Sequence, residues 1–294
     1  MIPGSFDYHA PTTLDDAVAL LTEHGGDAKI LAGGHSLIPA MRFRLAVPDV
    51  LIDINRIPDL EYIREEDGHL VIGGLTRESA LEESSLVQEK YPLLADTAKV
   101  IADPLVRNLA TVGGNLAHAD PANDHPATML AYGASVVAHG PNGARTIAID
   151  DFFVDLFATA LERSEILTEI RIPTPPTGSA NAGGAYLKME RKVGDYAVSA
   201  VAVQLVMDGD TVVSARLGLT NVNPVPMRAI AAEAELIGKE LNDEVLEAVG
   251  RAAAAECDPS ADLRGSVEYK RDLTRVLTKR VIKKAVERAK GGDS

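Results

Sequence analysis

Ala32-Gly33-Gly34-His35-Ser36 and Thr111-Val112-Gly113-Gly114-Asn115 are the two stretches around which this chain is organised. Each signature has two adjacent glycines beside a hydroxylated residue, and each follows a short apolar run. Adjacent glycines let the backbone adopt positive φ and approach another group closely. Successive N–H groups in such a conformation form a concave surface that binds anions. We therefore interpret the signatures as two walls of a dinucleotide site, with a pair of ordinary tight turns as the alternative.

The residues around the first signature support this interpretation. A short strand is predicted at 29–31, a helix at 37–45 and a buried strand at 49–54. The order strand, glycine turn, helix directs backbone N–H groups at a phosphate. The hexapeptide G-x-G-x-x-G does not occur in the sequence, so a standard Rossmann domain is disfavoured.

Short polar residues follow the second signature closely. Asp120, Asn123 and Asp124 are suited to the ribose hydroxyls of a dinucleotide, and Asn123 or Asp124 could equally cap the following helix. The two interpretations are compatible. His118 and His125 flank this loop, but their spacing is not a recognised ligand pattern, so no metal site is predicted.

The second half of the chain begins after a stretch rich in proline and glycine. Residues 173–184 contain no charge and are predicted to form a linker or a long exposed loop. Three strands are predicted beyond it, at 185–190, 199–207 and 211–220. Three helices should follow at 227–237, 243–255 and 267–289, the last behind the N-cap candidate Ser266.

Composition excludes several classes of function. The chain has 294 residues with 29 basic and 43 acidic side chains, a net charge of −14, which argues against a nucleic-acid partner. The single cysteine, Cys257, cannot form an iron–sulfur or zinc site of four cysteines, so any iron–sulfur centre must lie on another chain. The N-terminus lacks signal-peptide features, and the longest nearly apolar run, 197–207, is about half of a membrane span. We expect a cytoplasmic protein, or one at the inner face of the cytoplasmic membrane.

Four separated motifs together resemble a known family. The two glycine signatures, Asp120-Pro121-x-x-Asp124, and Lys188 with Gly194-Asp195-Tyr196 look like the FAD-binding medium subunits of molybdenum hydroxylases. The opening Met-Ile-Pro-Gly-Ser-Phe-Asp-Tyr and Gly-Leu-Thr-Asn-Val at 218–222 are most similar to the medium subunits of aerobic carbon monoxide dehydrogenases. The resemblance covers essentially the whole chain.

The resemblance implies an α+β fold of two domains. Residues 1–177 would form a two-lobed, vanillyl-alcohol-oxidase-like (PCMH-type) FAD-binding domain. Residues 178–290 would form a C-terminal domain of three antiparallel strands and a helical bundle.

The family match also implies which residues contact FAD. The first wall would comprise Lys29, Leu31, Ala32, Gly33, Gly34, His35, Ser36 and Leu37, and the second Ile101, Ala102, Thr111, Gly113, Gly114, Asn115 and Ala117. His118, Asp120, Asn123 and Asp124 would lie near the ribityl or ribose groups, and Ile166 and Leu167 would line the adenine pocket. Lys188, Asp195 and Tyr196 would reach the flavin from the second domain: a cation near the pyrimidine edge stabilises the reduced ring, and a tyrosine can pack on it. No residue of this chain is implied to be catalytic.

The implied function is electron transfer within a larger enzyme. A large molybdopterin subunit would oxidise the substrate, a small subunit with [2Fe–2S] clusters would pass electrons on, and FAD would collect them for a membrane quinone or cytochrome. The implied assembly is (αβγ)2. Alternatives are a molybdenum hydroxylase of N-heterocycles or aldehydes, a self-contained FAD oxidoreductase, and a scaffold that binds no flavin.

Overall fold

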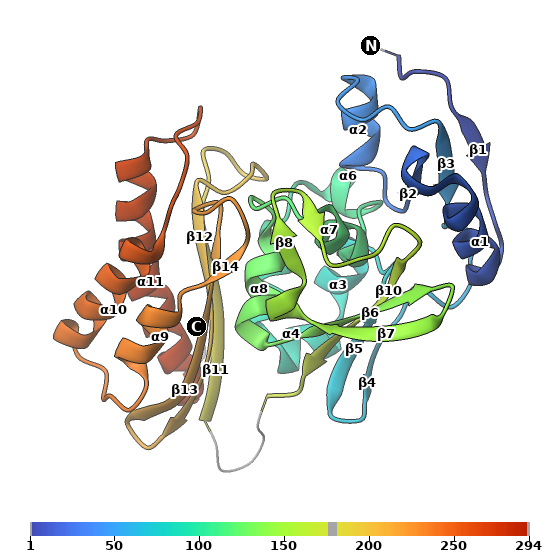
Figure 1. Ribbon diagram of the computed structural model, residues 1–294. Helices are drawn as coiled ribbons and strands as arrows, with labels where there is room; N and C mark the ends of the chain where they lie inside the picture. Colours follow the sequence, from blue (N-terminus) through green and yellow to red (C-terminus); the bar gives the residue numbers. More distant parts are fainter. Residues whose placement is uncertain (1, 176–180, 293–294) are drawn as a thin grey trace.

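The computed structural model describes residues 2–175 and 181–292 (Figure 1). The small N-terminal lobe is a three-stranded parallel sheet in the order β1-β3-β2, with α1 packed on it and α2 after the first glycine signature. The bounds are β1 Asp7–His9, α1 Leu14–His24, β2 Ala28–Leu31, α2 Leu37–Arg42 and β3 Val50–Asp53. The helix predicted at 37–45 is therefore shorter than expected, and the residues that follow it leave Phe43 and Leu45 largely exposed.

The second lobe is a five-stranded antiparallel sheet in the order β4-β5-β10-β6-β7, covered by helices. Its strands are β4 Ile63–Glu66, β5 His69–Gly73, β6 Ser135–Gly140, β7 Gly143–Ala148 and β10 Ile166–Pro173, with a small hairpin of β8 Phe153–Asp155 and β9 Ala158–Thr159. Its helices are α3 Glu78–Glu83, α4 Ser85–Lys90, α5 Pro92–Val100, α6 Pro104–Arg107, α7 Val112–His118 and α8 Asp124–Tyr132.

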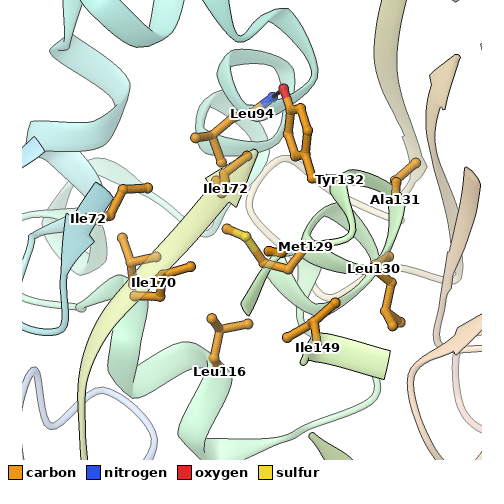
Figure 2. Packing of buried hydrophobic residues seen from close by; sticks show 14 of the residues in the cluster. Ile72, Leu94, Leu116, Met129, Leu130, Ala131, Tyr132, Ile149, Ile170 and Ile172 are labelled. Atoms are coloured by element: carbon orange, nitrogen blue, oxygen red, sulfur yellow. Dashed lines mark hydrogen bonds between the residues drawn. The ribbon is translucent and has the colours of Figure 1, made fainter. Parts of the chain in front are cut away.

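The core of this lobe forms where β10 faces α7 and α8. Figure 2 shows Ile170 and Ile172 of β10 packed with Leu116 of α7 and Met129 of α8. Tyr132 is buried in the same cluster, and its hydroxyl accepts a hydrogen bond from the backbone N–H of Leu94 at 3.3 Å. The second signature, which begins α7, is therefore part of a helix packed into this core.

The C-terminal domain is an antiparallel sheet with helices on one face and α8 of the first domain on the other. Its elements are β11 Asn181–Met189, β12 Ser199–Asp208, β13 Thr211–Thr220, β14 Met227–Arg228, α9 Ile230–Leu236, α10 Asp243–Glu256 and α11 Val267–Ala289. The predicted α+β class is confirmed, and the two-residue β14 adds an edge to the three expected strands. Gly218 of β13 lies against Ala127 of α8 so closely that a β-carbon would overlap its carbonyl oxygen.

The linker prediction for 173–184 is wrong at its end. β11 begins at Asn181, because α11 packs so closely on this strand that a β-carbon at Gly183 would overlap the carbonyl oxygen of Ala285. The glycines therefore mark a close approach of helix to strand and not a flexible loop. The proposed domain boundary between 177 and 178 lies outside the described residues, so it remains a prediction.

No helix within 2–175 and 181–292 is long and apolar enough to cross a bilayer.

Candidate functional site

The two glycine signatures, distant in sequence, lie against each other. A β-carbon at Gly33 would overlap the carbonyl oxygen of Leu109 and lie 2.7 Å from the α-carbon of Ala110. A β-carbon at Gly114 would lie 3.7 Å from the β-carbon of Ala32. The expectation that they form one structural unit is confirmed, and Gly33 is the point of closest approach.

The first signature offers unpaired backbone donors. It connects β2 to α2, and Gly34 adopts φ +75°. Among the described residues, the N–H groups of residues 33–36 have no hydrogen-bond acceptor. Carbonyl oxygens here do have partners: that of Ala32 accepts from the Asn55 side chain at 2.8 Å. Adjacent free N–H groups at a helix start are suited to an anion.

The second signature is a capped helix start and not an open turn. Thr111 is the N-cap of α7, and its hydroxyl accepts from the N–H of Gly114 at 3.2 Å. Val112, Gly113 and Asn115 donate to the carbonyl oxygens of Thr76, Gly74 and Thr111. The N–H groups of residues 112–115 therefore all have acceptors within the protein, and the role of this signature as the second wall of the site stays a prediction.

Asn115 nevertheless presents a polar atom without a partner. Its Oδ1 is buried and accepts no hydrogen bond from any described residue, while its backbone oxygen accepts from the Asn123 side chain at 3.0 Å. Asn123 is the N-cap of α8 but makes no side-chain capping bond, so the capping alternative for Asn123 is not what the structure has. A buried acceptor that lacks a donor costs free energy unless a ligand or water supplies one. This oxygen suits a ligand hydroxyl.

Asp124 and Lys188 form a buried ion pair between the two domains. Lys188 Nζ lies 3.0 Å from Asp124 Oδ2 and donates to the carbonyl oxygen of Val100 at 3.0 Å. The Tyr186 hydroxyl donates to the other oxygen of Asp124 at 2.6 Å. Burial raises the pKa of the Asp124 carboxyl, and the Lys188 ammonium acts against that increase. These contacts fix Lys188 in one position; Tyr186 has no signal in the sequence that marks it for this role.

The residue after Asp124 in α8 takes part in a second buried pair. His125 and Glu78 are fully buried, and His125 Nε2 lies 2.7 Å from Glu78 Oε2. The pair joins α8 to α3. Just before α3, the carbonyl oxygen of Thr76 accepts the hydrogen bond from the N–H of Val112. Sequence reasoning considered His125 only as a metal ligand, because Glu78 is remote in the chain.

The segment from Gly194 to Tyr196 lies against the first domain. A β-carbon at Gly194, which has φ +79°, would lie 2.7 Å from the carbonyl oxygen of Ala102. Tyr196 is 42% exposed. Burial of part of its side chain raises the pKa of its hydroxyl, and the nearby Asp120 carboxylate raises it further. The contact of Gly194 with Ala102 brings this segment of the second domain against the first, and the place of Tyr196 beside the flavin stays a prediction.

The structure also shows the surroundings of other residues that the resemblance implies for the site. Arg107 donates to the carbonyl oxygens of Ile101 and Ala102, and Ala102 itself has φ +47°. The His118 ring packs against Phe157 with centroids 5.2 Å apart, and burial lowers the pKa of His118. Lys29 and Ala117 are exposed.

Ile166 and Leu167 belong to hydrophobic cores, with Ile166 in the cluster against which Ala32 packs. They are 3% and 7% exposed. Their proposed contact with adenine remains a prediction.

A cavity of about 480 Å³ lies elsewhere, between the two domains beside β11. None of its lining residues is one of the predicted site residues; they are Glu65, Lys90, Thr174, Pro175, Asn181, Ala182, Arg288, Ala289, Lys290 and Gly291. We therefore place the candidate site by its donors and contacts and not by this cavity.

Comparison with known proteins assigns both halves of the chain. Residues 4–175 match the FAD binding domain in molybdopterin dehydrogenase, and residues 184–285 match the CO dehydrogenase flavoprotein C-terminal domain. The carbon monoxide dehydrogenase medium chain of Hydrogenophaga pseudoflava is 48% identical over 285 residues, covering 97% of this chain and 98% of the relative.

Solved structures agree. A chain of the Hydrogenophaga pseudoflava carbon monoxide dehydrogenase that lacks the Mo-pyranopterin moiety has TM-score 0.95 and 49% identity, with 98% of this chain and 99% of that chain covered. A chain of quinoline 2-oxidoreductase from Pseudomonas putida 86 has TM-score 0.91 and 32% identity, with 99% of each covered.

Proposed function

The chain belongs to the FAD-binding family of molybdopterin dehydrogenases, and we propose that it is the electron-transferring FAD subunit of an aerobic carbon monoxide dehydrogenase. The substrate assignment rests on sequence identity to this chain, which is higher for carbon monoxide dehydrogenase subunits than for subunits of related enzymes. Two carbon monoxide dehydrogenase medium chains are 48% and 47% identical to it, whereas subunits named for 6-hydroxypseudooxynicotine, glyceraldehyde and caffeine are 33–36% identical.

The residues of the first signature fit an FAD pyrophosphate. The four N–H groups of residues 33–36 have no acceptor among the described residues and would donate to phosphate oxygens. The unpartnered Oδ1 of Asn115 would accept from a ribityl or ribose hydroxyl. The site residues that the resemblance implies are proposed on this basis, with the second signature acting through side chains and shape.

Lys188 and Tyr196 would act on the flavin ring. Bound FAD supplies a carrier that accepts two electrons and releases them to an external acceptor. Lys188 is held by Asp124, by Glu190 at 3.4 Å and by the carbonyl oxygen of Val100, so it would not need to be ordered when FAD binds. Tyr196 would cover the ring and exclude water from it.

Partner subunits would deliver the electrons. The relatives are medium chains or subunits of larger enzymes by name. We propose that this chain works with a small [2Fe–2S] subunit and a large molybdopterin subunit in an (αβγ)2 assembly that reduces a membrane quinone or cytochrome.

The test is co-expression of the chain with the large and small subunits of its own source, followed by turnover with carbon monoxide, quinoline and an aliphatic aldehyde. Electron transfer from carbon monoxide to a quinone analogue at the highest rate supports the proposal. Turnover of quinoline or the aldehyde but not carbon monoxide would identify one of the other molybdenum hydroxylases. Turnover by the purified chain alone would contradict the subunit assignment.

A further inference from the structure

Tyr196 has a charged residue on one face of its ring. The guanidinium carbon of Arg264 lies 5.4 Å from the ring centroid, within the range of a cation–π contact. Tyr196 is 42% exposed, so part of its side chain remains open. A tyrosine that is supported from one side and open on another is arranged to present its ring to a ligand.

One carboxylate oxygen links Arg264 to the backbone of Tyr196. Asp195 Oδ1 accepts from Arg264 Nη2 at 2.8 Å and from the N–H of Tyr196 at 2.8 Å. The Asp195 side chain is 8% exposed. Because a single buried atom receives both donors, the guanidinium and the tyrosine backbone cannot move independently without breaking one of these bonds.

Arg264 is itself held in place by the loop before α11. The N–H groups of Arg264 and Gly265 donate to Asp262 Oδ1 at 2.7 and 3.1 Å. The other oxygen of Asp262 lies 2.8 Å from Nζ of Lys270, whose side chain is 3% exposed. The backbone at Arg264 is therefore anchored to α11 through Asp262 and the buried Lys270.

Arg264 Nε provides an independent observation. It is buried and donates to no described residue, although the side chain as a whole is 25% exposed. An unpaired buried donor is tolerated where it serves another purpose. Here the guanidinium faces the aromatic ring, which accepts a positive charge on its face.

We propose that Arg264 is a positioning residue that orients Tyr196 over the isoalloxazine ring of bound FAD. This inference rests on the proposed FAD function. Arg264 itself need not touch the flavin: it holds the tyrosine from the opposite side and, through Asp195, fixes the backbone from which the ring projects.

Arg191 provides a matched control. It also pairs with Asp195, at 3.4 Å, but its side chain is 51% exposed and it has no contact with the Tyr196 ring among the described residues. Arg191 also donates to the carbonyl oxygen of Leu263 at 3.2 Å, so its loss removes one positive charge from the same carboxylate and one contact with the loop before α11, while Arg264 and the Tyr196 ring both remain.

The experiment measures the fluorescence lifetime of FAD bound to the full-length chain. A tyrosine stacked on flavin quenches its emission by electron transfer, so Tyr196→Phe should lengthen the lifetime. Arg264→Ala and the milder Arg264→Gln should each produce more than about half of that increase, because the ring loses its support. Arg191→Ala should match the wild type, and Arg264→Lys should restore part of the quenching.

Four outcomes separate the claims. Wild-type lifetimes in both Arg264→Ala and Arg264→Gln, with Tyr196→Phe lengthened, would overturn the positioning role. An unchanged lifetime in Tyr196→Phe with FAD bound would overturn the stacking contact and the inference with it. An effect of Arg191→Ala as large as that of Arg264→Ala would assign the effect to Asp195 and the Leu263 loop, which both arginines share, and overturn the role of the ring contact. Absence of bound FAD in the wild-type chain would contradict the proposed function.

Discussion

Gly33 touches the main chain of Leu109, with no room between them for a β-carbon. This contact joins the turn after β2 to the segment before α7, and so holds the first signature, with its free N–H groups, against the start of the second. The contact therefore brings two short glycine motifs from different lobes together in a single candidate site.

Replacing Gly33 should disrupt the site. In Gly33→Ala the methyl group meets rigid backbone, which costs about 1–3 kcal/mol when the structure must shift. Because the shift moves the backbone of the first signature, FAD affinity should drop roughly tenfold or more. Gly26→Ala, whose nearest neighbour is the flexible end of Arg163 at 3.3 Å, is the control and should bind like wild type. Titration of FAD with each purified chain measures both, and wild-type affinity in Gly33→Ala would show that the contact is not needed.

Lys188→Met should destabilise the fold in a way that depends on pH. The change leaves the buried Asp124 carboxylate without its cation, a loss of about 3–5 kcal/mol for a broken buried pair. Burial then raises the Asp124 pKa further above its unfolded value, with the Tyr186 hydrogen bond and His125 still acting against the increase, so protonation favours the folded state. The free energy of unfolding should therefore fall as pH rises from about 4 through neutrality.

Urea unfolding at several pH values measures this effect. The double variant Lys188→Met/Asp124→Asn removes the titrating group and should lose the added pH dependence. A cost for Lys188→Met that is the same at low and neutral pH would contradict the assignment.

Asp96 should stabilise the domain interface with the opposite pH dependence: its contribution to the free energy of unfolding should be lost as pH falls. It pairs with Arg288 at 2.7 Å and Lys284 at 3.1 Å. Burial alone would raise the pKa of Asp96, but the two cations outweigh it and hold the pKa below its usual value. The stabilisation is therefore present above the unfolded pKa of about 3.9 and is lost as pH falls through the lower folded value.

Asp96→Asn should accordingly be much less stable than wild type at neutral pH, with a smaller difference in acid. Asp210→Asn is the matched control, because Asp210 pairs with Lys290 at the exposed surface and should have a much smaller effect. Unfolding curves at neutral pH and below pH 4 measure the free energy of unfolding of both variants. Equal losses of this free energy in the two variants would argue against an interface role for Asp96.

Local patterns in the sequence predicted elements that depend on local physics. The last helix was expected at 267–289 behind Ser266, and α11 has these bounds, with the Ser266 hydroxyl accepting from the N–H of Tyr269. Periodic apolar residues and a capping serine are sufficient there. Short helices were missed, as α4, α6 and α7 show, because tertiary packing stabilises them more than propensity does.

The site was predictable to the extent that its residues sit in motifs. Glycine signatures predicted that segments far apart would meet, but not that α7 would use its own donors through Thr111. Tyr186, Glu78 and Arg264 were missed because each acts through a partner remote in sequence. No spacing rule connects Arg264 to Tyr196; only the folded chain brings them together.

The most direct test of the account is anaerobic addition of carbon monoxide to the complex assembled from this chain and its two partner subunits, with the visible flavin absorbance followed in time. We predict that the absorbance bleaches after carbon monoxide is added, and that the isolated FAD-loaded chain stays oxidised under the same conditions. Flavin that stays oxidised in a complex whose iron–sulfur clusters are reduced would contradict the role assigned to this chain.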